Sequence, residues 1–266
     1  MTPTLLRPVD IEPPRAAGLG LARDGATPIF LSLVMPAFNE ETAIEEVISD
    51  HVEVLKTHRK HIAGWEIVCV DDASSDRTSR ILERLNARLA ALKVIRHIEN
   101  KGTYQSFADG FAVAKGTHVY ATGADGQWPA RNLDVMLGSL ASGVDLVVGV
   151  RLNRNRIYGL KRRLVSSAFN TSARVLFGVK TLDAGSVKLG LRDVFRLDLI
   201  SRSPFAEAER IIRARRLGYR VDFVPVEFRT RGGGRESGAR WSNVVASARD
   251  CLRCAAAYGV CRGRRR

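Results

Sequence analysis

Continuous apolar runs alternate with amphipathic stretches through the middle of the chain. Residues 29–38, IFLSLVMPAF, form a short run closed by Pro36, which predicts a strand buried on both faces. Residues 39–58 then carry apolar side chains at helical spacing behind an acidic first turn, with Asn39 or a neighbour as the expected cap. A buried strand is therefore followed directly by an amphipathic helix.

This alternation continues for about a hundred residues. The segment 65–76 is predicted to be a second buried strand that ends in two acids and a turn. Further strands are predicted at 92–98, 117–125 and 144–150, and helices at 77–90, 103–116 and 131–142. The pattern predicts an α/β fold with a mostly parallel sheet and helices on both faces. Such sheets bind ligands at the carboxyl ends of their strands.

Three polar clusters directly follow apolar strands in this pattern: Asn39–Glu40, Asp71–Asp72 and Asp125–Gln127. An Asp after a strand is commonly a turn residue or a helix cap, and we interpret Asp76 as such a cap. Three clusters at one sheet edge are harder to explain as independent caps, because gathered carboxylates raise each other's pKa unless cations or donors compensate them. A nucleotide with its bound cation would supply that compensation.

Charge changes the expected partners. The 266 residues carry a formal charge of +14, and the segment 201–266 alone has sixteen arginines against six acids. Such a balance favours anionic partners, although an arginine-rich solubilising surface gives the same count. Nucleic acid is not expected, since no RRM, KH or helix-turn-helix pattern is present. An NAD-type oxidoreductase is disfavoured, because no G-x-G-x-x-G motif follows the first strand.

Cysteines and chain termini add little. Four cysteines do not make a disulfide framework, and the Cys251–Cys254 C-x-x-C pair is interpreted as helix packing. The sequence has neither a signal peptide nor an apolar run of about 18 residues. We therefore expect a cytoplasmic protein, at most peripheral on the inner face of the cell membrane. Residues 1–28 are predicted to be a mobile leader.

Four motifs in order resemble one known family. They are VMPAFNEE, VCVDDASSDRT, ENKGTYQSFADGFAVAKGTHVYATGADGQWP and FGVKTLDAGSVKLG. The chain resembles family 2 glycosyltransferases of the GT-A fold, and especially the branch of dolichyl- and polyprenyl-phosphate sugar synthases. The resemblance runs from about Leu31 to about Arg253 and implies a GT-A (Rossmann-like) domain at 29–240.

The resemblance also implies a nucleotide-sugar donor and residues that bind it. The implied nucleotide-binding residues are Pro36, Ala37, Phe38, Glu40, Asp71, Asp72, Asn100, Lys101 and Gly102. Of the two adjacent acids, Asp72 is the more favoured partner of the base. The glycine that the family usually has after these acids is Ala73 here.

Asp125 and Gln127 match the last acid and the Gln of the family's D-x-D-x-Q pattern, and the first acid is replaced by Gly123. These two residues are the implied ligands of Mg²⁺ or Mn²⁺. A diphosphate-bridging cation commonly has one or two protein carboxylates. With one of them missing, weak or partial metal dependence is expected, and basic loops are expected to share the neutralisation of the leaving diphosphate.

The expected reaction moves a sugar from the nucleotide to a lipid phosphate, with inversion implied by the resemblance. A glycan or small-molecule hydroxyl is the alternative acceptor, and a non-catalytic nucleotide- or nucleic-acid-binding role comes after it. A hydroxyl acceptor needs a base, so the catalytic candidates are Asp125, Asp183 and Glu209. Glu209 is also placed to pair with Arg213 on a helix. The candidate phosphate or acceptor contacts are Lys188, Arg192, Arg229 and Arg231.

The segment 241–266 is predicted to form an amphipathic helix and a basic tail. Its apolar positions share one stripe, and the sequence ends in RGRRR. An amphipathic helix with arginine clusters can lie on an anionic membrane surface, which is a further expected partner. The alternative is a helix that packs back on the domain.

Overall fold

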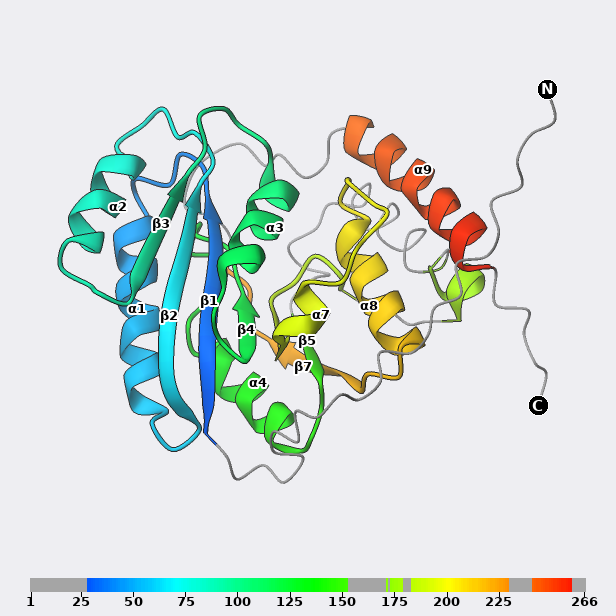
Figure 1. Cartoon of the computed structure of the whole chain (residues 1–266), viewed down its shortest axis with the longest axis horizontal. Helices are drawn as coiled ribbons and strands as arrows, with labels where there is room; N and C mark the ends of the chain where they lie inside the picture. Colours follow the sequence, from blue (N-terminus) through cyan, green and yellow to red (C-terminus); the bar gives the residue numbers. More distant parts are fainter. Residues whose placement is uncertain (1–27, 153–170, 172, 179–182, 230–240, 260–266) are drawn as a thin grey trace.

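A single seven-stranded sheet runs through the described part of the chain, which comprises residues 28–152, 171, 173–178, 183–229 and 241–259 of this computed structural model (Figure 1). Its strands are β1 (Ile29–Ala37), β2 (Ile62–Asp71), β3 (Leu92–Arg96), β4 (His118–Ala121), β5 (Leu146–Arg151), β6 (Lys188–Leu191) and β7 (Val221–Val226). The strand order is β3-β2-β1-β4-β6-β5-β7. All pairings are parallel except those of β6, which is antiparallel to both β4 and β5. The predicted α/β fold with a mostly parallel sheet is confirmed.

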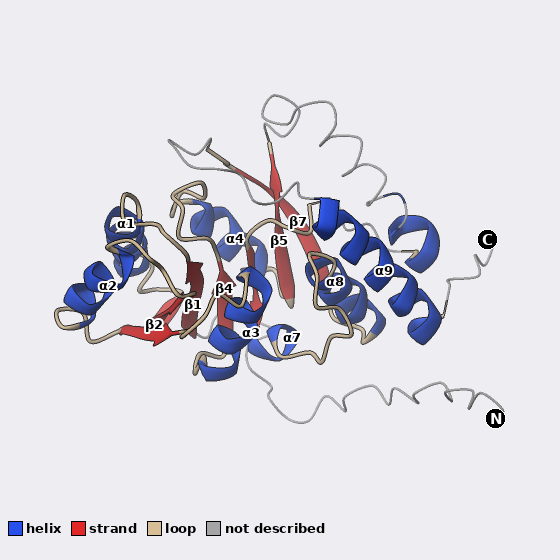
Figure 2. Ribbon diagram, turned by 90° about the horizontal axis from the view of Figure 1, so that it is seen from above, coloured by secondary structure: helices blue, strands red, loops and turns tan. Residues whose placement is uncertain are grey.

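Helices cover both faces of this sheet, as Figure 2 shows from above. They are α1 (Ile44–Thr57), α2 (Thr78–Asn86), α3 (Thr103–Val113), α4 (Asn132–Ala141), α7 (Arg192–Phe195), α8 (Ala206–Arg216) and α9 (Trp241–Tyr258). Helices α1, α2 and α4 share one apolar core with one face of the strands, and α3, α7, α8 and α9 share a second core with the other face. Alternation along β1 explains the division, because Leu33 faces the first core and Val34 the second.

The helix after β1 begins later than the sequence predicts. α1 starts at Ile44 rather than at residue 39, and no side chain caps it. The expected cap, Asn39, has a positive φ of 55° and accepts a hydrogen bond from the Ser75 backbone N–H instead. Residues 38–43 are thereby left as a loop at the end of β1, where they can line a site.

The second half of the sheet depends on β6, which the sequence pattern does not predict. This four-residue strand inserts between β4 and β5 and reverses direction. Gly190 permits the close approach, since a Cβ there would lie 2.4 Å from the Asp145 carbonyl oxygen. Its insertion carries the chain from the β1–β4 half of the sheet to the half that supports α8 and α9.

The predicted C-terminal helix is present as α9 and packs back on the domain. Its buried residues include Cys251 and Cys254, which confirms that this C-x-x-C pair serves helix packing. No helix in the described part of the chain has the length and apolar character needed to cross a bilayer. Residues 1–27 and 260–266, which contain nearly all of the predicted leader and most of the basic tail, lie outside the described residues.

Candidate active site

The three predicted polar clusters meet at one edge of the sheet. β1 pairs in parallel with β2 on one side and with β4 on the other, so all three carboxyl ends point the same way. Backbone hydrogen bonds extend beyond the strands, from Asp72 N–H to the Ala37 carbonyl (2.9 Å) and from Thr122 N–H to the Val34 carbonyl (3.1 Å). The loops that begin at 38, 72 and 122 therefore emerge side by side.

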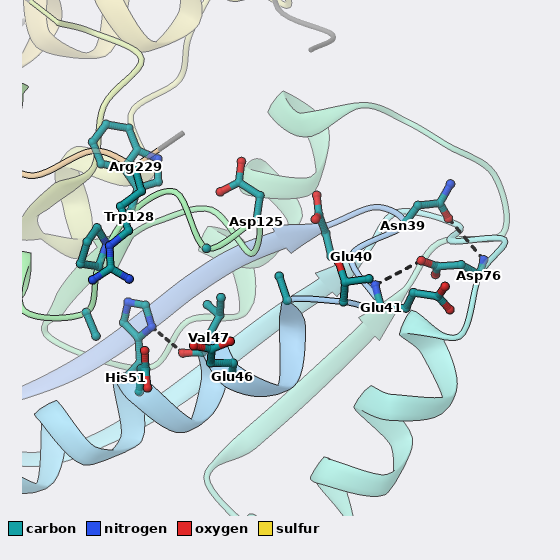
Figure 3. Close-up of a pocket in the computed structure, with 16 residues that line it drawn as sticks. Asn39, Glu40, Glu41, Glu46, Val47, His51, Asp76, Asp125, Trp128 and Arg229 are labelled. Atoms are coloured by element: carbon teal, nitrogen blue, oxygen red, sulfur yellow. Dashed lines mark hydrogen bonds between the residues drawn. The ribbon is translucent and has the colours of Figure 1, made fainter. Parts of the chain in front are cut away.

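A cavity of about 730 Å³ opens between the start of α1 and the loop 125–130 (Figure 3). Three residues predicted to bind the nucleotide, the metal or a phosphate, Glu40, Asp125 and Arg229, line it together. The other lining residues are Asn39, Glu41, Thr42, Ala43, Glu46, Val47, Asp50, His51, Asp76, Gly126, Trp128, Pro129 and Ala130. Helix α1 and the loops that follow β1, β2, β4 and β7 thus contribute to one concave surface.

Acidic side chains dominate the cavity wall. Among the described lining residues, six are carboxylates, those of Glu40, Glu41, Glu46, Asp50, Asp76 and Asp125, and one is an arginine, Arg229. Backbone and side-chain hydrogen bonds from Arg77 lower the pKa of Glu41 below its usual value. Burial alone would raise the pKa of Asp76, but hydrogen bonds from Thr78 and Glu41 lower it. The described lining therefore carries more negative than positive charge near neutral pH, although the whole chain carries +14.

Asp125 and Gln127 are held in the loop after β4 by local hydrogen bonds. An Asp125 carboxylate oxygen accepts from the Gln127 backbone N–H at 3.1 Å. The Gln127 side-chain amide donates to the Arg229 carbonyl at 3.2 Å, and the Arg229 N–H donates back to the Gln127 carbonyl at 2.8 Å. This reciprocal pair connects the β4 loop to the end of β7 and places the Arg229 side chain at the cavity.

The donor set around Asp125 is incomplete for a protein-only metal site. Among the described residues, no group of three or more His, Cys, Asp or Glu side chains is arranged to hold an ion. One carboxylate and one amide oxygen fit a divalent cation only when phosphate oxygens or water complete its shell. The arrangement suits a cation that arrives with a diphosphate.

Asp71 and Asp72 at the end of β2 are buried and engaged with the protein. Asp71 is 0% exposed, accepts from the Ser74 N–H at 3.0 Å, and also accepts from the Ser79 hydroxyl. Asp72 is 3% exposed and accepts from the backbone N–H groups of Lys101 and Gly102, each at 2.8 Å. The expectation that Asp72 presents its carboxylate to a base is corrected here, because these contacts make it a positioning residue for the 100–102 loop.

His97 completes the environment of Asp72. Its ring nitrogens lie 2.7 Å from an Asp72 oxygen and 2.9 Å from an Asp109 oxygen. Burial alone would raise the pKa of Asp72, but the hydrogen bonds from His97, Lys101 and Gly102 together bring it below its usual value. Sequence analysis did not identify His97, which lies inside the strand predicted at 92–98 and directly after β3 as the structure has it.

The remaining predicted nucleotide-binding residues lie at the same edge. Pro36 and Ala37 end β1, and Phe38 follows with 45% of its surface exposed. The Asn100 side chain donates to the Asp72 carbonyl at 3.2 Å, which ties its loop to β2. Ala73 has a φ of 60°, a conformation that favours glycine and accounts for the Gly of the family pattern.

Two predicted functional residues have structural roles instead. Lys188 is 2% exposed and donates to the Ala184 and Ser186 carbonyls and to Glu207 at 2.8 Å, so its ammonium group is fully used inside the protein. Glu209 is 0% exposed and accepts from the backbone N–H groups of Ile200 and Ser201, each at 2.8 Å. These contacts correct the predictions of a phosphate contact and a catalytic base.

Glu209 also accepts a hydrogen bond from the Tyr258 hydroxyl, which connects α8 to α9. Its expected helical partner, Arg213, donates to the Asp198 carbonyl instead. Arg192 donates to the Lys115 carbonyl at 3.1 Å. Arg231, the other predicted phosphate contact, lies outside the described residues.

Asp183 forms a buried ion pair that the sequence analysis did not foresee. The Arg151 guanidinium lies 2.6 Å and 2.7 Å from its two oxygens and stacks over the rings of Trp128 and Phe228. Asp183 is only 4% exposed. Its carboxylate therefore neutralises Arg151 behind the Trp128 wall of the cavity, and the expectation that it acts as a general base is corrected.

Sequence analysis also missed His51, which lines the cavity. It is 1% exposed, and its Nδ1 lies 2.7 Å from the Val47 carbonyl (Figure 3). Burial lowers the pKa of its ring, so it adds no positive charge against the surrounding acids at neutral pH. In the sequence His51 stands at the helical spacing of the buried residues of α1, which is typical of a core residue. Only the tertiary structure places it beside loop 125–130.

The sheet and its edge site have the architecture of GT-A glycosyltransferases. A family model described as glycosyl transferase family 2 matches residues 32–197, which include every element from β1 to α7. The chain belongs to this family.

Curated relatives extend the similarity. The chain is 32% identical over 161 residues to an undecaprenyl-phosphate 4-deoxy-4-formamido-L-arabinose transferase of Pectobacterium carotovorum, covering 58% of this chain and 46% of the relative. It is 24% identical over 247 residues to a dolichyl-phosphate beta-glucosyltransferase of Trichomonas vaginalis, covering 86% and 74%. The chain spans about half the length of several curated relatives that it matches.

Solved structures share the fold. Glucosyl-3-phosphoglycerate synthase from Mycobacterium tuberculosis, in complex with Mn²⁺, UDP-glucose and phosphoglyceric acid, superposes with a TM-score of 0.65 at 20% identity and covers 86% of this chain and 82% of its own. A mannosyltransferase from Pyrobaculum calidifontis with GDP-mannose and Mn²⁺ gives 0.60 at 20% identity, covering 88% and 67%. At this identity the likeness concerns the fold.

The Asp72 contacts predict a pH-dependent contribution to stability. Because the folded-state pKa is lowered, the carboxylate stabilises the fold above its unfolded pKa of about 3.9, and this contribution is lost as pH falls through the folded value. Asp72→Asn should lower the free energy of unfolding at pH 7 by about 1–3 kcal/mol, because one buried N–H loses a charged acceptor. Urea unfolding at pH 7 and at lower pH measures the difference.

The deficit of Asp72→Asn relative to the wild type should shrink once the pH is below about 4. Asp222→Asn, a change at an exposed acid on β7, serves as the control. A deficit that is equal at both pH values would contradict the ionised-carboxylate explanation and leave only a packing effect.

Proposed function

We propose that this protein transfers a sugar from a nucleoside-diphosphate sugar to a polyprenyl-type lipid phosphate. The observation that carries the proposal is the acid-lined cavity, in which Glu40, Asp125 and Arg229 converge from three parts of the chain. Family membership supports a glycosyltransferase, and the names of two relatives specify undecaprenyl-phosphate and dolichyl-phosphate. We extend these acceptors to this chain as part of the proposal.

The donor nucleoside would bind against the ends of β1 and β2. Phe38 offers an exposed aromatic face, and Glu40 is a carboxylate that can accept from ribose hydroxyls. The ordered 100–102 loop, held by Asp72, offers Asn100 and Lys101 beside them. Asp72 thus acts on the nucleotide through the loop that it positions.

The diphosphate would lie near Asp125, where a bare anion would meet six carboxylates. Asp125 and the Gln127 side-chain oxygen would hold Mg²⁺ or Mn²⁺, and a divalent cation supplies positive charge that stabilises the leaving diphosphate. Arg229 is the cationic side chain among the described lining residues and would neutralise part of the same charge. With Gly123 in place of a second acid, we propose weak metal affinity.

The engagement of Asp183 and Glu209 supports a phosphate acceptor. A hydroxyl acceptor needs a base within hydrogen-bond reach. Two of the three predicted bases, Asp183 and Glu209, are buried in structural contacts, and the third, Asp125, is proposed to hold the cation. A phosphate monoester is already an anion near neutral pH and can attack unaided. Its oxygen would form the new bond to the anomeric carbon while the bond to the diphosphate oxygen breaks, and the leaving nucleoside diphosphate takes the electron pair.

A single displacement of this kind inverts the anomeric configuration. Retention by double displacement would need a carboxylate nucleophile positioned at the anomeric carbon. Asp183 is occupied by Arg151, and Glu209 by the backbone of residues 200–201. We therefore include inversion in the proposal.

Donor binding tests the cavity directly. Of UDP, GDP, dTDP and CDP, one should raise the melting temperature with Mn²⁺, because a ligand of the native state stabilises it by mass action. Asp125→Asn should weaken the Mn²⁺-dependent part of that affinity by about tenfold or more, equivalent to about 1.4 kcal/mol. Calorimetry with Mn²⁺ and with EDTA measures both quantities.

Asp222→Asn is the matched control, since it removes an acid on β7 that does not line the cavity. Equal affinity in EDTA would assign the diphosphate to Arg229 and its neighbours rather than to a metal. Failure of all four nucleotides to bind at millimolar concentration would overturn the proposed donor.

Gly123→Asp should strengthen metal binding. A Cβ at this position would lie 3.3 Å from an Asp125 carboxylate oxygen, so the new carboxylate would stand beside Asp125 and share its cation. Adding a second oxygen ligand should tighten Mn²⁺ binding in the presence of the nucleotide by about tenfold. Calorimetric titration of Mn²⁺ checks this.

The control is Gly138→Asp on α4, where a Cβ would meet no atom within 4 Å. It adds the same charge away from the cavity and should leave Mn²⁺ affinity unchanged. Equal effects of the two substitutions would show that only net charge matters and would refute a shared site at Asp125.

Acceptor class is tested with a short-chain polyprenyl phosphate and the matching prenyl alcohol. We expect glycosylation of the phosphate and at least about a hundredfold slower reaction of the alcohol. A neutral hydroxyl needs a base, whereas Asp183 and Glu209 are engaged in structural contacts and Asp125 is proposed to hold the cation. Release of nucleoside diphosphate and mass spectrometry of the product measure the two rates. Faster reaction of the alcohol would instead establish hydroxyl transfer.

A further inference from the structure

Helix α9 buries a face of small and polar residues and exposes larger apolar side chains. Its buried residues are Ser247, Asp250, Cys251, Cys254 and Ala255. Asp250 accepts from the Arg202 N–H at 3.0 Å, and the Cys254 sulfur lies 3.5 Å from the Ser201 hydroxyl. Together with the Tyr258–Glu209 hydrogen bond, these contacts set the rotation of the helix about its axis.

The opposite face presents a line of large apolar residues. Trp241, Val245 and Leu252 are 65%, 65% and 66% exposed. Their spacing of four and seven residues places them on one side of the helix, over a length of about 16 Å. The smaller Ala248 and Ala256 are exposed between and beyond them. Single exposed apolar residues are common on soluble proteins, but an aligned stripe of this kind marks an interaction surface.

Positive charge borders this α9 stripe. Arg249 and Arg253 are exposed on the neighbouring row of the same helix. Arg213, Arg215 and Arg216 fill the last turn of α8, and Arg216 donates to the Gly259 carbonyl at 3.0 Å, which places this turn against the end of α9. Of the acids near these arginines, Glu209 and Asp250 are 0% and 2% exposed, whereas Asp198, whose carbonyl accepts from Arg213, is exposed. The surface beside the stripe is therefore basic.

We infer that the α9 stripe docks on an anionic phospholipid membrane surface. Apolar side chains would enter the boundary between headgroups and acyl chains, Trp241 would lie at headgroup depth, and the arginines would pair with lipid phosphates. The inference extends the proposed function, because a lipid-phosphate acceptor lies in a membrane. It rests on α9 itself and can be tested without donor or acceptor.

The charges favour a membrane over a second copy of the chain. A symmetric dimer through this stripe would bring the arginines beside α9 close to those of its partner, and like charges at an interface oppose association. Nucleic acid would satisfy the arginines but would leave the aliphatic side chains of Val245 and Leu252 without an apolar partner. An anionic bilayer satisfies both kinds of side chain.

The arrangement also separates the two charged regions of the protein. α9 lies on α8 beside the β5–β7 half of the sheet, whereas α1 and the acidic cavity lie toward the other half (Figures 1 and 2). A membrane held at α9 would therefore not press its negative charge against the carboxylates of the cavity.

Co-sedimentation with vesicles of phosphatidylcholine, with and without phosphatidylglycerol, tests the inference. The full chain should bind the anionic vesicles about tenfold more strongly than the neutral ones, and added salt should weaken the binding. The double variant Val245→Ser/Leu252→Ser and the variant Arg249→Glu/Arg253→Glu should each lose about tenfold in binding to anionic vesicles. Thermal unfolding of each variant verifies that it is folded.

Val135→Ser is the matched control, because Val135 is 48% exposed on α4, away from α9. Unchanged vesicle binding in both α9 variants, or absence of binding by the wild type, would overturn the inference. Light scattering that shows a dimer dissolved by Val245→Ser/Leu252→Ser, without vesicle binding, would assign the stripe to a second copy.

The variants also keep this inference separable from the proposed function. Transfer to a water-soluble short-chain prenyl phosphate needs no membrane, so its rate should be the same in wild type and α9 variants. Loss of transfer with vesicle binding retained would refute only the proposed function. Loss of vesicle binding by the wild type with transfer retained would refute only the docking surface.

Discussion

Parallel pairing of β1 with β2 and β4 is the constraint on which the rest of the site depends. It forces the carboxyl ends of three strands to one edge and so brings together acids that lie about 30 to 85 residues apart in the sequence. Carboxylates crowded in this way are stable only if each finds donors, a cation or water. Much of the local structure at this edge can be understood as the means by which each acid is accommodated.

The acids fall into two groups according to those partners. Asp71 and Asp72 are buried and accept hydrogen bonds from backbone N–H groups, a hydroxyl and His97. These hydrogen bonds hold the loops at 72–76 and 100–102 in place. Asp125 and Glu40 instead line the cavity, where a ligand can reach them. Acidic residues at this sheet edge therefore have two roles. Asp71 and Asp72 stabilise the surrounding loops, whereas Asp125 and Glu40 are accessible to a ligand.

Buried charged side chains in the second half of the sheet also find partners, and there they position helices. Lys188 and Glu207 form an ion pair inside the protein, and Glu209 links α8 to the 200–201 backbone and to α9. These buried charges set how α8 and α9 pack, and the packing leaves the apolar stripe of α9 outward. Five arginines of α8 and α9 lie beside that stripe, whereas six carboxylates line the cavity.

The sequence by itself determined the order of strands and helices from β1 to β5, because periods of two and 3.6 residues are properties of local segments. It also determined that polar clusters follow β1, β2 and β4, and hence that one sheet edge carries the candidate site. The sequence did not predict the antiparallel strand β6. Four residues are too few to show a hydrophobic period, and β4, one of the two strands that pair with β6, is distant in the chain. The identity of the cavity-lining residues near Asp125 and Arg229 was partly foreseen through the resemblance.

Only the tertiary structure decided which charged residues are available. The sequence predicted reactive roles for Lys188, Asp183 and Glu209. In the structure each is paired with a residue or backbone segment that is distant from it or unpredictable from the local pattern. For α9, periodicity indicated an apolar stripe but could not say which face the domain would cover. That choice depended on Asp250, Cys254 and Tyr258 meeting partners on the 201–209 segment, contacts that exist only once the sheet has brought α8 into place.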